Sequence, residues 1–282
     1  MTNGTGSLRI GELSRRVGVS AELLRAWERR YGLLQPSRTA GGFRLYSEDD
    51  ERRVRTMQEL LASGLSAAEA ARTALAEPGT AAVAAPDALA AELRAALDGF
   101  DEQAAHAAFD ALLAAYTLET VLGGVVLPYL KELGDRWESG EATVAQEHFA
   151  THVIRGRLLG LARGWDRGVG PRALLACPSG ELHDLPLVVF GVALRGRGWR
   201  VTFLGADTPP ETLADAAALL GPELVVVAAA TAGRFDGAAG ELAALASHHR
   251  LAVAGAGATH ELAERLAAEL LGGDPVAAAA GV

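Results

Sequence analysis

The sequence has 282 residues, of which 50% are hydrophobic and 22% charged, so it can form two or three domains with substantial cores. Its single cysteine, Cys177, excludes an internal disulfide framework and favours a reducing compartment. No apolar run reaches the roughly 18–20 residues needed to cross a bilayer. We therefore expect a cytoplasmic protein with no membrane partner.

Charge is distributed unevenly along the chain. The net charge is −9, but residues 1–47 contain eight arginines and three glutamates, a balance of +5 that leaves −14 for the rest. Such asymmetry is typical of a small nucleic-acid-binding module attached to an acidic body. DNA would approach only the basic end.

The first 31 residues predict a helix-turn-helix. Apolar residues recur at helical spacing over residues 9–17, Gly18 ends the helix, and Ser20 is a good N-cap for a second helix over residues 21–31. That helix keeps its arginines outside and can enter a major groove, or it can simply present a solvated basic face. Its predicted buried stripe is Leu23, Leu24 and Trp27.

The next segment, residues 36–46, has glycines at its tip and arginines on its flanks, which suits a small wing that reaches phosphates. Ser47 then caps a helix that continues from Asp50 to Leu61. A further short helix leads to a Pro-, Gly- and Ala-rich linker over Glu77–Asp87.

Residues 8–76 resemble the MerR family of winged-helix transcription regulators. The resemblance lies in residues 10–14 (IGELS), residues 24–34 (LRAWERRYGLL), Arg38 and residues 42–46 (GFRLY). It implies double-stranded operator DNA as a partner, and Trp27 and Tyr31 could instead belong to the core. The implied DNA-contact residues are Arg25, Trp27, Arg29, Arg30, Tyr31, Arg38, Arg44 and Tyr46.

The middle of the chain predicts a four-helix bundle. Trp137 ends one helix and Glu147 and His148 begin the next, so a turn can bring an indole, a carboxylate and an imidazole onto one wall that suits a nucleoside. The alternative is a core tryptophan with an exposed Glu-His pair. The predicted helices are Ala88–Leu97, Glu102–Tyr116, Leu118–Trp137 and Val144–Leu161.

Strands alternate with helices in the last third, which predicts a doubly wound parallel α/β sheet. The loops after the strands meet at one edge, where Gly255-Ala256-Gly257 would allow a ligand to approach the backbone. The predicted strands are Ala173–Cys177, Arg200–Gly205, Leu224–Ala229 and Leu251–Gly255, with a weak fifth at Val276–Ala280.

One of these loops contains His183, between an apolar strand and a helix start, where α/β sheets bind ligands. Glu181 lies two residues earlier and can orient the imidazole, as carboxylates do for metal-bound histidines. A loop histidine can equally be ordinary polar surface.

Residues 181–186 (ELHDLP), 203–209 (FLGADTP) and 255–257 (GAG) resemble the cobalamin-binding domain of methionine synthases and methylmalonyl-type mutases. The Trp137 and Glu147-His148 pattern resembles the cap of CarH-type photoreceptors. Together these resemblances imply that His183 ligates the cobalt of adenosylcobalamin beneath a cap. The implied cofactor-binding residues are Trp137, Glu138, Glu147, His148, Glu181, His183, Gly255 and Gly257.

The chain departs from these families at four places. Pro186 replaces a glycine, Ala228 stands where a serine is expected, and Gly255-Ala256-Gly257 stands where two adjacent glycines are usual. Glu138 replaces the histidine that follows the tryptophan in the CarH-type photoreceptors. A carboxylate is a weaker partner for cobalt than an imidazole. The departures leave open whether light is the signal and whether the sensor still takes cobalamin.

The sequence therefore predicts a transcription regulator, not an enzyme. We expect a repressor that senses adenosylcobalamin and light by changing its homo-oligomeric state, with a tetramer as the dark form. The alternatives are a regulator whose sensor binds another ligand or none, and a cobalamin-dependent methyl carrier or enzyme module. The predicted domains are a winged helix-turn-helix over residues 1–80, a four-helix-bundle cap over 81–167 and a Rossmann-like domain over 168–282.

Overall fold

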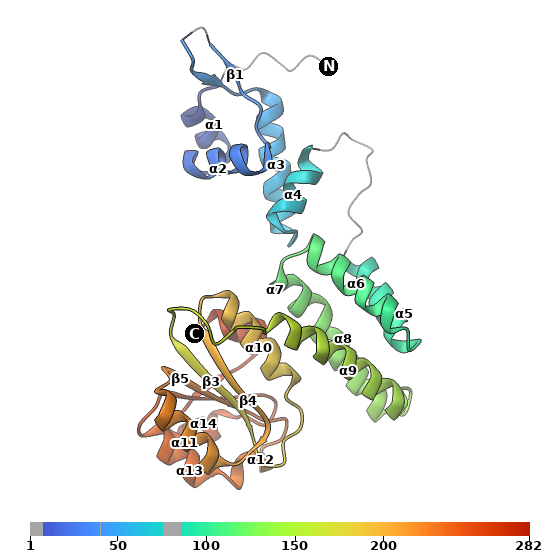
Figure 1. Cartoon of the computed structure of the whole chain (residues 1–282), viewed down its shortest axis with the longest axis vertical. Helices are drawn as coiled ribbons and strands as arrows, with labels where there is room; N and C mark the ends of the chain where they lie inside the picture. Colours follow the sequence, from blue (N-terminus) through green and yellow to red (C-terminus); the bar gives the residue numbers. More distant parts are fainter. Residues whose placement is uncertain (1–7, 40, 76–85) are drawn as a thin grey trace. The chain divides into compact units, whose positions relative to one another are not determined.

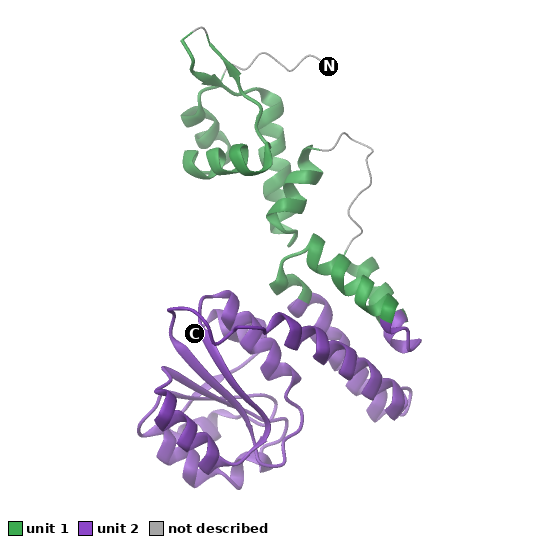
Figure 2. Cartoon of the chain, in the orientation of Figure 1, with its two compact units in different colours: residues 1–95, 103–121 green, residues 96–102, 122–282 purple. Residues whose placement is uncertain are grey.

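A computed structural model describes residues 8–39, 41–75 and 86–282. The chain divides into two compact units, Met1–Ala95 with Gln103–Val121, and Ala96–Glu102 with Leu122–Val282 (Figure 2). Most of the predicted linker, residues 77–85, lies outside the described residues. The division into three domains stays a prediction.

The first unit begins with the predicted helix-turn-helix, α1 (Ile10–Val17) and α2 (Ala21–Tyr31). Gly18 ends α1 with a left-handed φ of 69°, and the Ser20 hydroxyl accepts the Leu23 amide at 3.2 Å as the cap of α2. The buried stripe is right for Leu24 and Trp27 but wrong for Leu23, which is 43% exposed. Each residue turns a helix by about 100°, which places Leu23 at the edge of the stripe.

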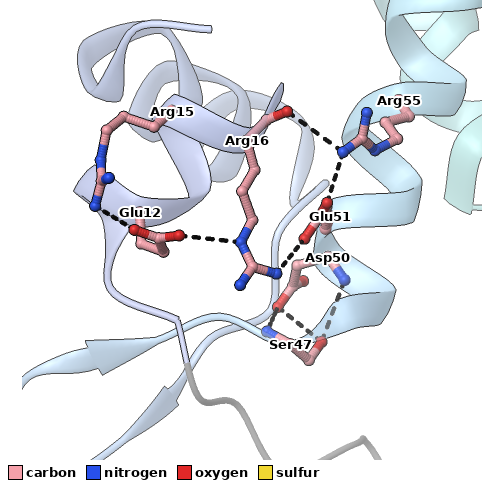
Figure 3. A network of polar contacts seen from close by, with 7 residues as sticks. All are labelled: Glu12, Arg15, Arg16, Ser47, Asp50, Glu51 and Arg55. Atoms are coloured by element: carbon pink, nitrogen blue, oxygen red, sulfur yellow. Dashed lines mark hydrogen bonds and ion pairs between the residues drawn. The ribbon is translucent and has the colours of Figure 1, made fainter. Parts of the chain in front are cut away.

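A two-stranded wing follows, β1 (Ser37–Arg38) paired antiparallel with β2 (Arg44–Leu45). Next come α3 (Glu48–Ala62) and α4 (Ala67–Leu75). Asp50 is buried and forms a capping box with Ser47, whose amide donates to Asp50 Oδ2 at 2.9 Å (Figure 3). Asp50 Oδ1 also accepts the Gln35 amide at 2.8 Å, so one carboxylate joins the start of α3 to the chain that enters the wing.

The helical segment continues as α5 (Pro86–Asp98), α6 (Glu102–Ala115) and α7 (Leu118–Val121). Within the first unit, the turn after α3 pairs with the turn after α6 through backbone hydrogen bonds. Ser66 N donates to Ala115 O at 2.9 Å and Thr117 N donates to Gly64 O at 2.8 Å. These bonds tie the helix-turn-helix module to α6 and α7.

The longer segment of the second unit begins with a π-helical turn, η1 (Leu122–Val126), followed by α8 (Leu127–Glu138) and α9 (Val144–Leu161). The predicted helix over Leu118–Trp137 is therefore helical along its whole length, but a π-helical turn interrupts its α-helical hydrogen bonding. Gly123 and Gly124 weaken the α-helix locally, and Pro128 has no amide to donate, so the backbone widens there before α8 begins.

The rest of this unit contains a five-stranded parallel sheet in the order β4-β3-β5-β6-β7. The four main predicted strands are confirmed, but the fifth is wrong, because Asp274 caps a helix that begins at Pro275 and continues through alanines. The strands are β3 (Arg172–Pro178), β4 (Arg200–Thr208), β5 (Leu224–Ala228), β6 (Leu251–Ala254) and β7 (Glu269–Leu271).

Helices cover both faces of the sheet, which confirms the doubly wound architecture (Figure 1). Side chains alternate along β3: Leu174 joins the core on one face and Leu175 the core on the other. One face of the sheet carries α10 (Leu185–Gly196) and α15 (Pro275–Ala280), and the other carries α11 (Pro210–Leu220), α12 (Gly233–Asp236), α13 (Ala239–Ala246) and α14 (His260–Leu266).

In the described part of the chain, every helix is too short or too polar to cross a membrane.

Asp50→Ala should lower the free energy of unfolding by about 2–3 kcal/mol, because two backbone amides lose their acceptor. Urea denaturation followed by circular dichroism measures this change. Asp49→Ala is the matched control, since it removes only an exposed ion pair with Arg52 and should cost less than about 1 kcal/mol. Equal losses in the two variants would show that Asp50 does not stabilise the junction.

Candidate functional site

His183 lies in the loop between β3 and α10, and its side chain is 79% exposed. Its Nδ1 lies 2.7 Å from Glu181 Oε1, which also accepts the His183 backbone amide at 2.8 Å. Because an ionised carboxylate only accepts hydrogen bonds, Nδ1 donates to Glu181, and Nε2 is the ring nitrogen left to offer a lone pair. This is the arrangement that a metal-ligating histidine requires.

Glu181 itself is buried, and its second oxygen accepts the Ala230 amide at 2.8 Å. Burial alone would raise the pKa of this carboxyl. The hydrogen bonds from the His183 and Ala230 amides and from the imidazole outweigh burial, so the pKa of Glu181 lies below its ordinary value. Glu181 therefore stays ionised and joins the His183 loop to the end of β5.

Two further carboxylates, both within the segments that resemble cobalamin-binding domains, hold the same loop, although neither was predicted as a site residue. Asp207, at a left-handed φ of 50° near the end of β4, accepts the Gly180 amide at 2.6 Å and donates its own amide to Glu181 O at 2.9 Å. Asp184 is buried and forms an ion pair with Arg155 of α9. A single sequence carries no signal for partners so far apart in the chain.

A largely apolar cavity of about 870 Å³ opens beside this loop, within the second unit. Pro186 and Ala228, two of the positions that depart from the cobalamin-binding pattern, both line it. His183 does not line the cavity, although Pro186 follows it by only three residues. The remaining walls come from η1, α8, α10, the ends of β6 and β7 and the start of α15.

Gly255 and Gly257 serve the protein's own packing. A Cβ at Gly255 would overlap Ala229 O, and one at Gly257 would overlap the backbone of Thr231. Gly257 is buried and donates its amide to Ala229 O at 3.0 Å. The neighbouring loop thus lies directly against both glycines, and Gly255 and Ala256 also line the cavity, so the approach of a ligand to this loop stays a prediction.

The candidate cap residues lie where α8 ends and α9 begins. Trp137 is half exposed, and Glu138 and His148 are exposed. Glu147 accepts the Thr151 hydroxyl at 2.9 Å, and its other oxygen lies 3.5 Å from His148 Nε2. A large indole left open to solvent is the kind of surface that receives a flat ligand.

The candidate DNA surface lies on α2 and the wing. Arg25, Arg29 and Arg30 of α2 are exposed. Trp27 and Tyr46 are buried, Tyr46 completely, so both belong to the core and their prediction as DNA contacts is corrected. Tyr31 is half-buried, with the Arg30 guanidinium 5.4 Å from its ring centre.

Two further residues of this surface, Glu28 and Phe43, were not among the predicted site residues. Glu28 accepts Arg44 Nε at 2.9 Å and the Tyr46 hydroxyl at 2.8 Å, and so joins α2 to the second strand of the wing. Burial and this hydrogen bond raise the pKa of Tyr46. Phe43, at the wing tip, is 62% exposed, with the Arg9 guanidinium 5.5 Å from its ring centre.

Ion pairs separate two classes of arginine in this unit. Arg15 and Arg16 pair with Glu12, and Glu51 pairs with both Arg16 and Arg55 (Figure 3). Arg16 and Arg55 thereby join α1 to α3, whereas the Arg15 pair stays within α1. In contrast, four exposed arginines of α2 and the wing have no ion pair within the described residues: Arg25, Arg29, Arg30 and Arg38.

Comparison with known proteins identifies the parts of the chain. Residues 8–77 match the MerR HTH family regulatory protein model, and residues 89–159 and 171–280 match two B12 binding domain models. The HTH-type transcriptional repressor CarA of Myxococcus xanthus is 36% identical over 226 residues, 78% of this chain and 76% of CarA. The repressor CarH of the same organism is 35% identical over 229 residues, 77% of each chain.

The chain belongs to the CarA/CarH family of transcriptional repressors. It is a transcription regulator with a MerR-type DNA-binding module and B12-binding domains, and not an enzyme. The fold agrees with this assignment. The monomethylamine corrinoid protein of Methanosarcina barkeri superposes with a TM-score of 0.58 at 18% identity, covering 69% of this chain and 97% of that protein.

Gly257→Ala should lower the free energy of unfolding by about 1–3 kcal/mol, because the added methyl group meets backbone that cannot move aside. Gly134→Ala on α8 is the matched control. Its Cβ would meet nothing within 4 Å, so alanine should stabilise the helix by about 0.5–1 kcal/mol. Urea denaturation distinguishes the two signs, and a neutral Gly257→Ala would show that the two loops separate easily.

Proposed function

We propose that this regulator binds adenosylcobalamin, with His183 Nε2 as the protein ligand of cobalt. The observation that carries the proposal is the Glu181–His183 pair, in which Nδ1 is held at 2.7 Å and Nε2 has no hydrogen bond within the described residues. A neutral imidazole oriented by an ionised carboxylate suits a cobalt ligand. The B12 binding domain model that matches residues 171–280 covers this pair and gives further support.

The apolar cavity is the proposed site for the nucleotide tail of the cofactor. Its volume of about 870 Å³ lies within the range of cofactor sites, and small or backbone-only walls such as Ala228, Ala254 and Gly255 admit a flat ring. Pro186 is the second residue of α10 and has no amide hydrogen, which a helix tolerates in its first turn.

Trp137, Glu147 and His148 are the proposed cap over the adenosyl group. When bound, the cofactor supplies a carbon–cobalt bond that light can cleave. The exposed indole offers a stacking face, while Glu147 and His148 offer polar contacts. Glu138, next to Trp137, is exposed and could approach cobalt only as a carboxylate, which binds it more weakly than imidazole.

Control of DNA binding through the oligomeric state completes the proposal. Several DNA-binding modules in one assembly raise the affinity for an operator through effective concentration. Loss of the adenosyl group would then release DNA by separating the modules, without any change to α2 or the wing. We propose a tetramer as the DNA-binding form.

A second candidate is a regulator whose sensor takes a different ligand. Pro186 and Ala228 favour it, because both replace the family's residues within the cavity and make its wall more apolar. The two candidates share the DNA-binding module and differ only in what the second unit binds.

Purified protein incubated with adenosylcobalamin in darkness should retain the visible absorbance of the cofactor after desalting. His183→Ala should lower the affinity about 10- to 100-fold and shift the spectrum away from the imidazole-ligated form. His248→Ala, an exposed histidine in the segment before β6, should behave as wild type. Absence of retained absorbance in the wild type would favour the second candidate.

The unpaired arginines should bind operator DNA in two ways. Arg25→Ala on α2 should weaken specific binding by about 1–3 kcal/mol if it reads a base, whereas Arg38→Ala in the wing should weaken all sequences alike and reduce the salt slope by about one. Arg15→Ala is the control, since Glu12 already pairs with that arginine. Binding to selected and random DNA at several salt concentrations tests this, and equal effects of both variants on both DNAs would refute the division.

A further inference from the structure

The ion pair between Arg155 and Asp184 joins α9 to the loop that carries His183. The Arg155 guanidinium donates from two nitrogens to the two oxygens of Asp184, with Nη2 2.8 Å from Oδ2. The Asp184 side chain is only 1% exposed. The hydrogen bond to Asp184 raises the pKa of Arg155 above its ordinary value. Two parallel bonds between planar groups fix orientation as well as distance.

Asp184 directly follows His183 and directly precedes α10. Its side chain does not cap that helix, so the Arg155 pair is its main polar contact. The loop is therefore held from two sides. Glu181 joins it to the end of β5 through the Ala230 amide, and Asp184 joins it to α9.

The same helix carries His148 of the proposed cap. His148 and Arg155 are seven residues apart, which is about two turns and about 10 Å along the axis, and places both on one face of α9. A single 18-residue helix thus carries a residue of the proposed cap and the residue that grips the His183 loop. A displacement of α9 as a rigid helix would therefore move both residues together.

We propose that Arg155 is a positioning residue for His183, acting through Asp184, so that the direction of the imidazole depends on the placement of α9. This inference rests on the proposed role of His183 as the cobalt ligand. It assigns to Arg155 no contact with the cofactor. It makes α9 the element through which the cap and the histidine influence one another.

The test compares Arg155→Gln with Arg163→Gln, an exposed arginine just beyond α9. The first measurement uses the full chain without cofactor. Hydrogen exchange of residues 180–185 should be about tenfold faster in Arg155→Gln, because Asp184 is left buried without its partner. The second adds adenosylcobalamin in darkness, where the ratio of histidine-ligated to unligated cofactor should fall about tenfold.

Two further variants keep the test decisive if Arg155→Gln unfolds, which a melting curve reports. Arg155→Lys keeps the charge but loses the two-point pairing, and should fall between wild type and Arg155→Gln. Arg155→Gln combined with Asp184→Asn removes the lone buried charge and permits a neutral hydrogen bond. It should restore part of both the exchange protection and the histidine-ligated spectrum.

An unchanged spectrum in folded Arg155→Gln would overturn the proposal, even if the loop exchanged faster. So would the same change in Arg163→Gln. Failure of the proposed function looks different: the wild type would retain no cobalamin, or His183→Ala would leave its spectrum unaltered. In that case the exchange measurement alone decides whether Arg155 positions the loop.

Discussion

The candidate site of the second unit depends on the hydrogen bonds that the buried carboxylate of Glu181 accepts. It accepts hydrogen bonds from the His183 amide and ring and from the Ala230 amide, and so connects the loop after β3 with the loop after β5. A buried charge is tolerable only when its hydrogen bonds are satisfied. Here the bonds that satisfy the charge also determine which nitrogen of His183 carries the proton.

The loop around Glu181 is organised by carboxylates from distant strands and helices. Asp207 holds Gly180 from β4, and Asp184 is held by Arg155 of α9. In the neighbouring glycine loop, Gly257 lies directly against the backbone of Thr231. An exposed histidine can therefore have a defined direction, because the backbone on each side of it is fixed to the sheet or to a helix.

In the DNA-binding module, ion pairing distinguishes arginines that stabilise the fold from arginines that face solvent. Arg16 and Arg55 meet Glu51 and brace α1 against α3, whereas the arginines of α2 and Arg38 of the wing face solvent. Glu28 accepts hydrogen bonds from Arg44 and Tyr46, and these bonds fix the second strand of the wing to α2. The positive charge of residues 1–47 predicts that DNA binds to this module. The ion pairs show which of its arginines have no carboxylate partner and are available to phosphates.

Local chemistry was enough to predict most elements of this chain. Gly18 and Ser20 determined the turn of the helix-turn-helix, and the capping signal at Ser47, the parallel strands and the proximity of Glu181 to His183 follow from short-range patterns. Tertiary contacts decided the rest. Trp27 and Tyr46 are buried in the core, and Val276–Ala280 is helical because Asp274 caps a helix there. Arg155 pairs with Asp184, which lies 29 residues further along the chain. Backbone propensity acts over a few neighbours, whereas burial and ion pairing depend on which distant segments the folded chain brings together.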